Sequence, residues 1–137
     1  MDDAFCGGPD GTSLNSTKSL VSKKTSSRVV AIILMGDPRH VRGLAYNAGN
    51  ATAGGVRPAL RIADIAKQSS QLTVCCQFAA RPLGFQCPEF EERIQLYCDS
   101  PDPFCSNGTD AAVHQGYGEE YGFDALRFIV SKLLISL

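Results

Sequence analysis

Few residues in this sequence could carry out hydrolytic chemistry. Only two histidines occur, His40 and His114. His114 stands in the segment VHQGYG, and Asp102 precedes it by twelve positions. An imidazole takes up and releases a proton near neutral pH, and a neighbouring carboxylate can fix its orientation and tautomer. Asp102 and His114 are therefore candidates for the orienting acid and the general base of a hydrolytic site.

The other histidine and the remaining cysteines indicate no further chemistry. His40 follows Asp37-Pro38-Arg39 in a predicted turn, so we expect a solvated surface histidine. Cys75 and Cys76 are adjacent, which is not the ligand spacing of a structural zinc site. Neither a metal nor an organic cofactor is expected.

The elements that must position Asp102 and His114 can be read from the apolar pattern. Val29–Met35 is an unbroken apolar run rich in β-branched residues, which predicts a strand buried on both faces of a parallel sheet. Ile94–Tyr97 predicts a second short strand that leads into a loop at Cys98–Asp102. Gly43–Gly55 is small and polar and is predicted to be a loop.

The last segment predicts a long helix, with His114 in the loop just before it. Its apolar residues repeat every three or four positions along one stripe, which is expected to face the core. These residues are Phe123, Leu126, Ile129, Val130, Leu133 and Leu134. The elements together predict an α/β fold, in which an acid followed by a base is the order found after the nucleophile of α/β-hydrolases.

The composition favours an extracellular protein. Six cysteines in 137 residues indicate an oxidising compartment, and N-x-[ST] triplets at Asn15, Asn50 and Asn107 are candidate glycosylation sites. A formal net charge of -1 gives no reason to expect nucleic acid as a partner. No apolar run is long enough to span a membrane. The acidic start Met1-Asp2-Asp3, with no apolar segment after it, is not the pattern expected of a signal peptide.

Several segments closely resemble the fungal acetylxylan esterases, which belong with the cutinases to carbohydrate esterase family five. The resemblance is most specific over Tyr97–Gly108 and over His114–Gly122. Met1–Gly8, Met35–Arg39 and Arg81–Pro88 also match the family pattern. The resemblance implies the C-terminal part of a three-layer α/β/α fold with a parallel sheet.

The resemblance also implies the chemistry: a Ser–His–Asp esterase with Asp102 as the acid and His114 as the base. The Gln115-Gly116 pair after His114 is more similar to acetylxylan esterases than to cutinases. The family pattern supports a disulfide between Cys98 and Cys105, and we expect Cys6 and Cys87 to form the second. Secretion is implied as well.

The sequence departs from the family pattern in two places. In the family a G-x-S-x-G motif precedes the Met-Asp-x-Ala segment, but no such motif occurs here. We therefore expect the N-terminal half of the domain to be missing, and with it the nucleophile and the oxyanion hole. Val56–Gln77 matches nothing in the family, and its flanks rejoin cleanly when it is removed, which suggests an intron read through in frame. The alternative is a genuine surface helix, for which Leu60, Ile62, Ile65 and Ala66 have suitable spacing.

The expected function follows from both the motifs and the departures. A complete enzyme, a monomer, would deacetylate xylan, whereas the printed chain is expected to be inactive. Two alternatives remain open at this point: a cutinase-like esterase acting on lipid polyesters, and a non-catalytic truncated secreted protein.

Overall fold

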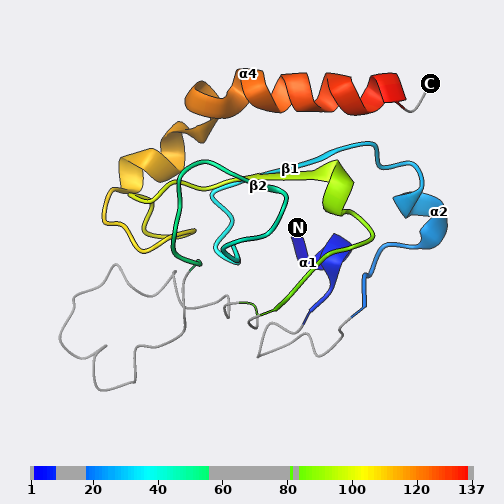
Figure 1. Cartoon of the computed structure of the whole chain (residues 1–137), viewed down its shortest axis with the longest axis horizontal. Coiled ribbons are helices and arrows are strands. Elements are labelled where there is room, and N and C mark those ends of the chain that lie inside the picture. Colours follow the sequence, from blue (N-terminus) through cyan, green and yellow to red (C-terminus); the bar gives the residue numbers. More distant parts are fainter. Residues whose placement is uncertain (1, 9–17, 56–80, 82–83, 136–137) are drawn as a thin grey trace.

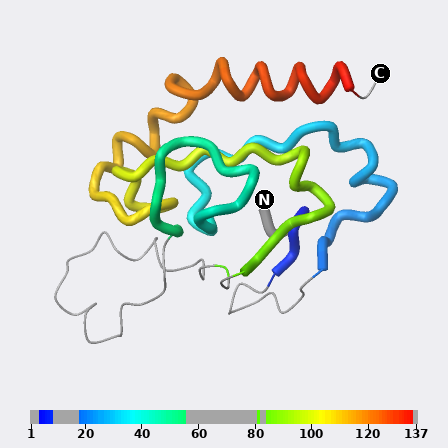
Figure 2. Tube along the Cα trace, viewed as in Figure 1, coloured from blue at the N-terminus to red at the C-terminus, as the bar shows by residue number. Residues whose placement is uncertain are grey.

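The structure, a computed structural model, describes residues 2–8, 18–55, 81 and 84–135. Three parallel strands form one sheet in the order β1-β3-β2: β1 (Ile32–Met35), β3 (Ile94–Tyr97) and β2 (Asn47–Ala48). β3 occupies the centre, with Ile32 beside Ile94 on one side and Asn47 beside Leu96 on the other. Figure 2 shows how segments far apart in the sequence meet in this sheet. Because the strands are parallel, their carboxyl ends lie at one edge.

Helices cover the sheet on both sides. The long helix α4 (Ala111–Ile135) runs along one side, and α1 (Asp2–Cys6) lies on the other, as Figure 1 shows. A short helix, α2 (Lys23–Ser26), precedes β1, and the 3-10 turn η1 (Glu91–Arg93) leads directly into β3. Within the described residues no helix is long and apolar enough to cross a membrane. The predicted α/β class with a parallel sheet is confirmed.

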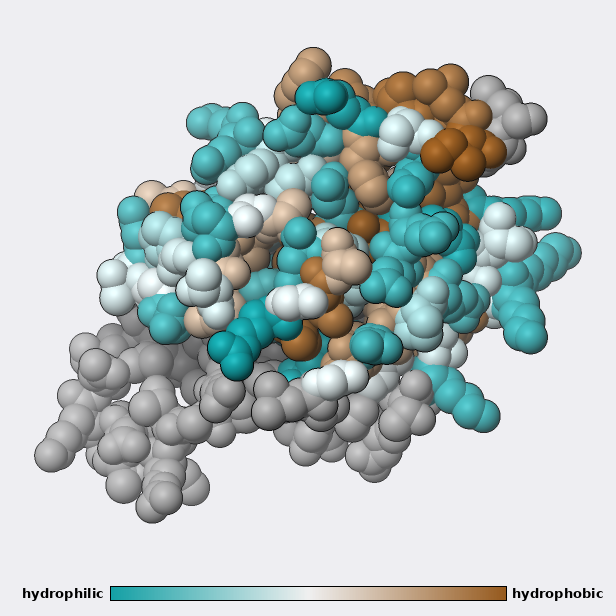
Figure 3. Space-filling view, in the orientation of Figure 1, coloured by the Kyte–Doolittle hydropathy of each residue, from teal (hydrophilic) through white to brown (hydrophobic). Residues whose placement is uncertain are grey.

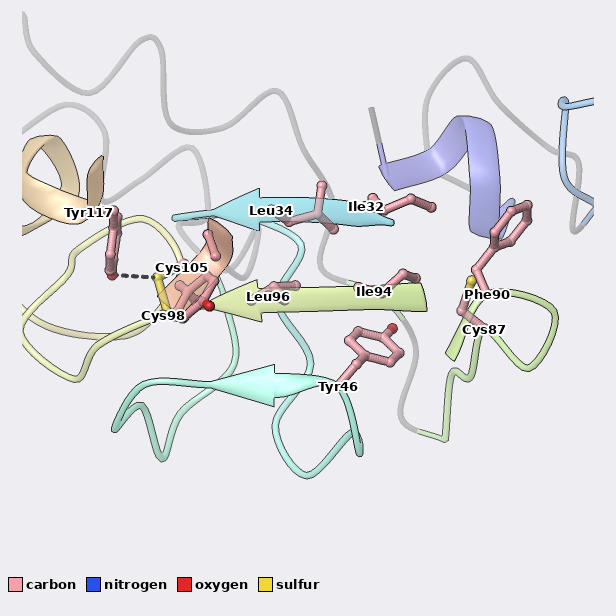
Figure 4. Close-up of a cluster of buried hydrophobic side chains, with 12 residues drawn as sticks. Ile32, Leu34, Tyr46, Cys87, Phe90, Ile94, Leu96, Cys98, Cys105 and Tyr117 are labelled. Carbon is pink, nitrogen blue, oxygen red and sulfur yellow. Dashed lines mark hydrogen bonds between the residues drawn. A yellow bond between two sulfur atoms is a disulfide. The ribbon is translucent and has the colours of Figure 1, made fainter. Parts of the chain in front are cut away.

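The hydrophobic core is built around β3. All but one of the residues of β3 are buried, and they pack against the buried residues of β1. Figure 4 shows this cluster together with Phe90, which contacts Phe5 of α1 edge-on at 5.3 Å between ring centroids. Further buried members are Tyr46, Cys87, Cys98, Cys105, Tyr117 and Ala125. The core therefore joins the central strand to the helices on either side.

The predicted strands occur, with one difference in length. Ile94–Tyr97 is a strand as expected, whereas β1 begins at Ile32, three residues later than predicted. The carbonyl of Val29 accepts a hydrogen bond from the Arg93 guanidinium at 2.9 Å, and its amide donates to Ser26. These contacts take the place of strand pairing at Val29. The expected Gly43–Gly55 loop contains the short strand β2.

The final helix differs from the prediction in its start and in the face it buries. It begins at Ala111, where the Asp110 carboxylate accepts a hydrogen bond from the Ala112 amide at 2.9 Å, as capping residues do. The buried residues of α4 are Tyr117 and Ala125. Most of the apolar stripe expected to face the core is instead exposed, and Figure 3 shows apolar surface over α4. The exposed members are Phe123, Leu126, Val130, Leu133 and Leu134.

Candidate active site

Asp102 lies in the loop that follows β3 at the carboxyl edge of the sheet. A disulfide between Cys98 and Cys105 closes this loop. The Asp102 side chain is fully buried, at 0% exposure, and its Oδ1 accepts hydrogen bonds from the amides of Phe104 (2.6 Å) and Cys105 (3.2 Å). Burial disfavours a charged carboxylate, and the two amides offset that penalty. The loop thus holds Asp102 in one orientation.

His114 meets Asp102 from the first turns of α4, and not from a loop as the sequence analysis expected. Its Nδ1 lies 2.9 Å from Oδ2 of Asp102. A carboxylate oxygen can only accept, so Nδ1 carries the hydrogen, and in the neutral imidazole this tautomer leaves the lone pair on Nε2. The side chain of His114 is 32% exposed. The pair therefore consists of a buried acid and a partly exposed base.

Two aromatic rings and a glycine surround the imidazole. The ring of Phe104 lies 4.5 Å from that of His114, and the ring of Tyr117 stands edge-on to it at 6.3 Å between centroids. Gly36, directly after β1, approaches the same imidazole closely. No pattern in the sequence indicated a role for these three residues.

Tyr117 connects the acid to the backbone of the same loop. Its hydroxyl donates a hydrogen bond to Oδ2 of Asp102 at 2.9 Å and accepts one from the amide of Asp99 at 2.8 Å. Burial is the main reason that the pKa of Tyr117 lies well above its ordinary value, so this hydroxyl stays a donor at physiological pH. Tyr117 follows His114 by three positions, which places both on one helix face. That spacing was the available signal in the sequence.

A second carboxylate, Asp99, lies three positions before Asp102 but has tyrosine instead of histidine as its partner. The Tyr121 hydroxyl lies 2.9 and 3.0 Å from the two carboxylate oxygens of Asp99. Oδ1 of Asp99 also accepts from the amide of Asn50 at 2.9 Å. Burial, followed by this carboxylate, raises the pKa of Tyr121 well above its ordinary value. Asp99 therefore ties together the loop, α4 and the segment after β2.

His40 is buried, at 4% exposure, which corrects the expectation of a solvated surface histidine. Its Nδ1 lies 2.9 Å from the carbonyl oxygen of Cys105 and supports the Asp102 loop from another direction. Burial lowers the pKa of His40 below its ordinary value, and backbone hydrogen bonds only partly oppose this. The turn residues before His40 suggested that its side chain is exposed. The sequence does not show that Cys105, distant in the chain, packs against this side chain.

Other residues named from the sequence fall in three groups. Cys6 and Cys87 form a disulfide, as expected for the second pair. Asn50 and Asn107 are exposed, which glycosylation requires. Asn15, the adjacent Cys75 and Cys76, and the whole of Val56–Gln77 lie outside the described residues. In the part of the chain that the structure describes, no group of three or more His, Cys, Asp or Glu could hold a metal ion.

The arrangement can transfer a proton to and from a reacting group beside Nε2 of His114. The α/β-hydrolase class combines a buried carboxylate with an imidazole bound through Nδ1, and both lie at the carboxyl edge of a parallel sheet. Within the 137 residues no G-x-S-x-G supplies the nucleophile that this class places beside the base.

Comparisons with known proteins agree with this class. The family model described as Cutinase matches residues 1–133, so the chain belongs to the cutinase family. It is 44% identical over 134 residues to Cutinase 11 of Verticillium dahliae and 42% identical to an acetylxylan esterase of Hypocrea jecorina. It is 41% identical to acetylxylan esterase 2 of Talaromyces purpureogenus. The resemblance to cutinase-like esterases inferred from the motifs is confirmed.

Solved structures give the same result. An acetylxylan esterase structure matches 97% of this chain with a TM-score of 0.76 and 40% identity, and the match covers 54% of that chain. The catalytic core domain of an acetyl xylan esterase from Trichoderma reesei matches 96% of this chain with a TM-score of 0.75 and 42% identity, covering 53% of its own chain. The chain spans 38%, 37% and 47% of the three curated relatives, which is less than half of each.

Proposed function

We propose that Asp102 and His114 are the acid and base of a secreted serine carboxylesterase that removes acetyl groups from xylan. The observation that carries this proposal is the 2.9 Å contact between Oδ2 of a fully buried Asp102 and Nδ1 of a partly exposed His114. Membership of a family of esterases supports it. Two disulfides and the exposed asparagines of two N-x-[ST] triplets are consistent with secretion.

The proposed reaction uses these two residues in the manner of a serine hydrolase. As the serine hydroxyl attacks the acetyl carbon, Nε2 of His114 accepts its proton. Asp102 holds the imidazole in the tautomer that leaves Nε2 free, and its negative charge stabilises the imidazolium that forms. His114 then gives the proton to the departing sugar oxygen, and a water molecule repeats the sequence to release acetate.

The nucleophile in this proposal comes from residues outside the printed sequence. The 137 residues contain no G-x-S-x-G, and the family resemblance places that motif before the segment that matches Met1–Gly8. The printed chain alone is accordingly proposed to be inactive, because His114 has no serine hydroxyl from which to take a proton. A complete enzyme is proposed to be a monomer.

Acetylated xylan is favoured over a lipid polyester as the substrate. The Gln115-Gly116 pair that follows the base resembles acetylxylan esterases, and two of the relatives above carry that name. The 44% identity to Cutinase 11 supports the alternative, an esterase that acts on a lipid polyester. A non-catalytic secreted role for the printed chain is the third candidate.

The test joins this chain to a nucleophile-bearing segment. The part of the Hypocrea jecorina acetylxylan esterase that precedes its matched region is fused to this chain, and the matched region itself is 42% identical to this chain. Acetate release from acetylated xylan and hydrolysis of a synthetic polyester are measured for the fusion and for the 137-residue chain alone. His114→Gln removes the base. Glu119→Gln, at an exposed position on the same helix, is the matched control.

The expected result is acetate release by the fusion and by its Glu119→Gln variant, but not by His114→Gln or by the 137-residue chain alone. Polyester hydrolysis without acetate release would favour the cutinase-like alternative. A folded fusion that hydrolyses neither substrate, or one whose activity survives His114→Gln, would contradict the proposal and leave the non-catalytic role.

A further inference from the structure

Gly36 brings bare backbone against the imidazole of His114. It directly follows β1, and its amide continues the sheet by donating to the carbonyl of Tyr97 at 2.9 Å. Its φ of +65° then turns the chain away from the strand direction. A Cβ atom placed on Gly36 would lie 2.6 Å from both Cε1 and Nδ1 of His114, and 3.1 Å from a ring carbon of Tyr117. Carbon atoms in proteins do not approach so closely without displacement.

The other neighbours of the imidazole leave it little room to move aside. Phe104 packs against the ring at 4.5 Å, and Tyr117 stands beside it. Asp102 binds Nδ1, the same atom that a Cβ on Gly36 would touch. A side chain at position 36 would therefore push the imidazole out of line with the carboxylate.

We propose that Gly36 is a positioning residue for His114, whose missing side chain lets the imidazole align Nδ1 with Oδ2 of Asp102. The catalytic meaning of this alignment rests on the function proposed above, but the alignment itself can be measured without ester hydrolysis. Gly36 at the end of β1 is thus part of the site, although it lies far from Asp102 and His114 in sequence.

Two other glycines share the positive φ of Gly36 but have open space where a Cβ would lie. Gly43 and Gly84 also have positive φ, at +80° and +82°, but a Cβ at either would meet nothing within 4 Å. An alanine at Gly43 would therefore carry the conformational strain of a positive φ and no collision with a side chain. Gly43→Ala is the matched control that separates strain from displacement of His114.

The test measures the imidazole tautomer in the 137-residue chain by nitrogen NMR at about pH 9, above the range in which histidine ordinarily titrates. Only two histidines contribute, and His114→Gln assigns them. The Nδ1–H form of His114 is expected in the unmodified chain and in Gly43→Ala. Gly36→Ala is expected to lose the Asp102 hydrogen bond and move His114 mainly to the Nε2–H form. Unchanged His40 signals show that the fold is retained.

A second experiment covers the case in which Gly36→Ala does not fold. If the imidazole causes the collision, Gly36→Ala lowers the melting temperature by several degrees less in a His114→Ala background than in the unmodified chain. An unchanged His114 tautomer in folded Gly36→Ala would overturn the proposal. So would an equal loss of the Nδ1–H form in Gly43→Ala, or equal thermal effects of Gly36→Ala in both backgrounds. Failure of the fusion to hydrolyse esters would leave these outcomes unaffected.

Discussion

Replacing Tyr117 by phenylalanine should destabilise the protein through two specific losses. The Tyr117 hydroxyl donates to Asp102 and accepts from the amide of Asp99, and the residue is 2% exposed. Phenylalanine keeps the ring and its packing but removes both hydrogen bonds. Asp102 retains its two amide donors, whereas the buried amide of Asp99 loses this partner.

The magnitude follows from these contacts. A hydrogen bond to a charged group contributes about 1.5–3 kcal/mol, and an unsatisfied buried donor costs about 1–3 kcal/mol. Because the two losses share one hydroxyl, we expect a combined loss of about 2–4 kcal/mol in the free energy of unfolding. With an unfolding entropy of about 2.1 cal/mol/K per residue, this lowers the melting temperature by about 7–14 °C for 137 residues.

Urea and thermal unfolding, followed by circular dichroism, measure the loss. Tyr121→Phe is the matched control because it makes the same chemical change one helical turn later. Tyr121 is half-buried and binds the Asp99 carboxylate, so its removal leaves the Asp99 amide bonded to Tyr117. We expect a loss of about 1–2 kcal/mol for the control. A Tyr117→Phe protein as stable as the unmodified chain, or one no less stable than Tyr121→Phe, would refute the reasoning.

Three further predictions concern stability. The partners of the Cys98–Cys105 disulfide are 7 positions apart and those of Cys6–Cys87 are 81 apart. Loop-closure entropy therefore gives a stabilisation of about 2.5 kcal/mol for the first and about 4.5 kcal/mol for the second. In urea unfolding, replacing both cysteines of Cys6–Cys87 by alanine should cost more stability than the same change at Cys98–Cys105. Because burial lowers the folded-state pKa of His40, its contribution to stability should be lost as the pH falls below 6.5 and through that lower pKa. An NMR titration midpoint for His40 at or above 6.5 would contradict this. We propose that Val56–Gln77 is an insertion dispensable for the fold, so its deletion should leave the melting temperature unchanged or higher; a drop of several degrees would show that the segment contributes to the fold.

The sequence identified the two residues that meet in the candidate site better than it predicted the elements that carry them. Asp102 and His114 stood in motifs specific enough to identify the family, and Ile94–Tyr97 had the apolar pattern of a buried strand. The capping Asp110 extended the final helix upstream, so His114 lies in α4 and not in a loop. A capping residue shifts the start of a helix by only a few positions, and the loop-forming residues beside it favour a different boundary.

Residues that act through tertiary contacts could not be found from the sequence. His40 is buried because Cys105, distant in the chain, packs on it, and Gly36 matters because α4 places His114 above the end of β1. Neither contact leaves a local pattern. The stripe from Phe123 to Leu134 had correct helical spacing, but Tyr117 and Ala125 on another face of α4 are the residues it buries. Periodicity identified the helix but not the side that packs on the sheet.

A comparison of two asparagine variants in the fusion protein tests whether Asp102 orients the base of an ester hydrolase. In Asp102→Asn the amide oxygen is expected to keep the two backbone amides that bind Oδ1, so an NH₂ group, which cannot accept, replaces Oδ2 beside Nδ1 of His114. Asp99→Asn changes a second buried carboxylate, which binds Tyr121. The account predicts that Asp102→Asn lowers kcat for acetate release by about 10³–10⁴ with little change in KM, while folded Asp99→Asn keeps kcat within about tenfold of the unmodified fusion. Equal kcat values for Asp102→Asn and the unmodified fusion, or an equally large loss in Asp99→Asn, would contradict the account.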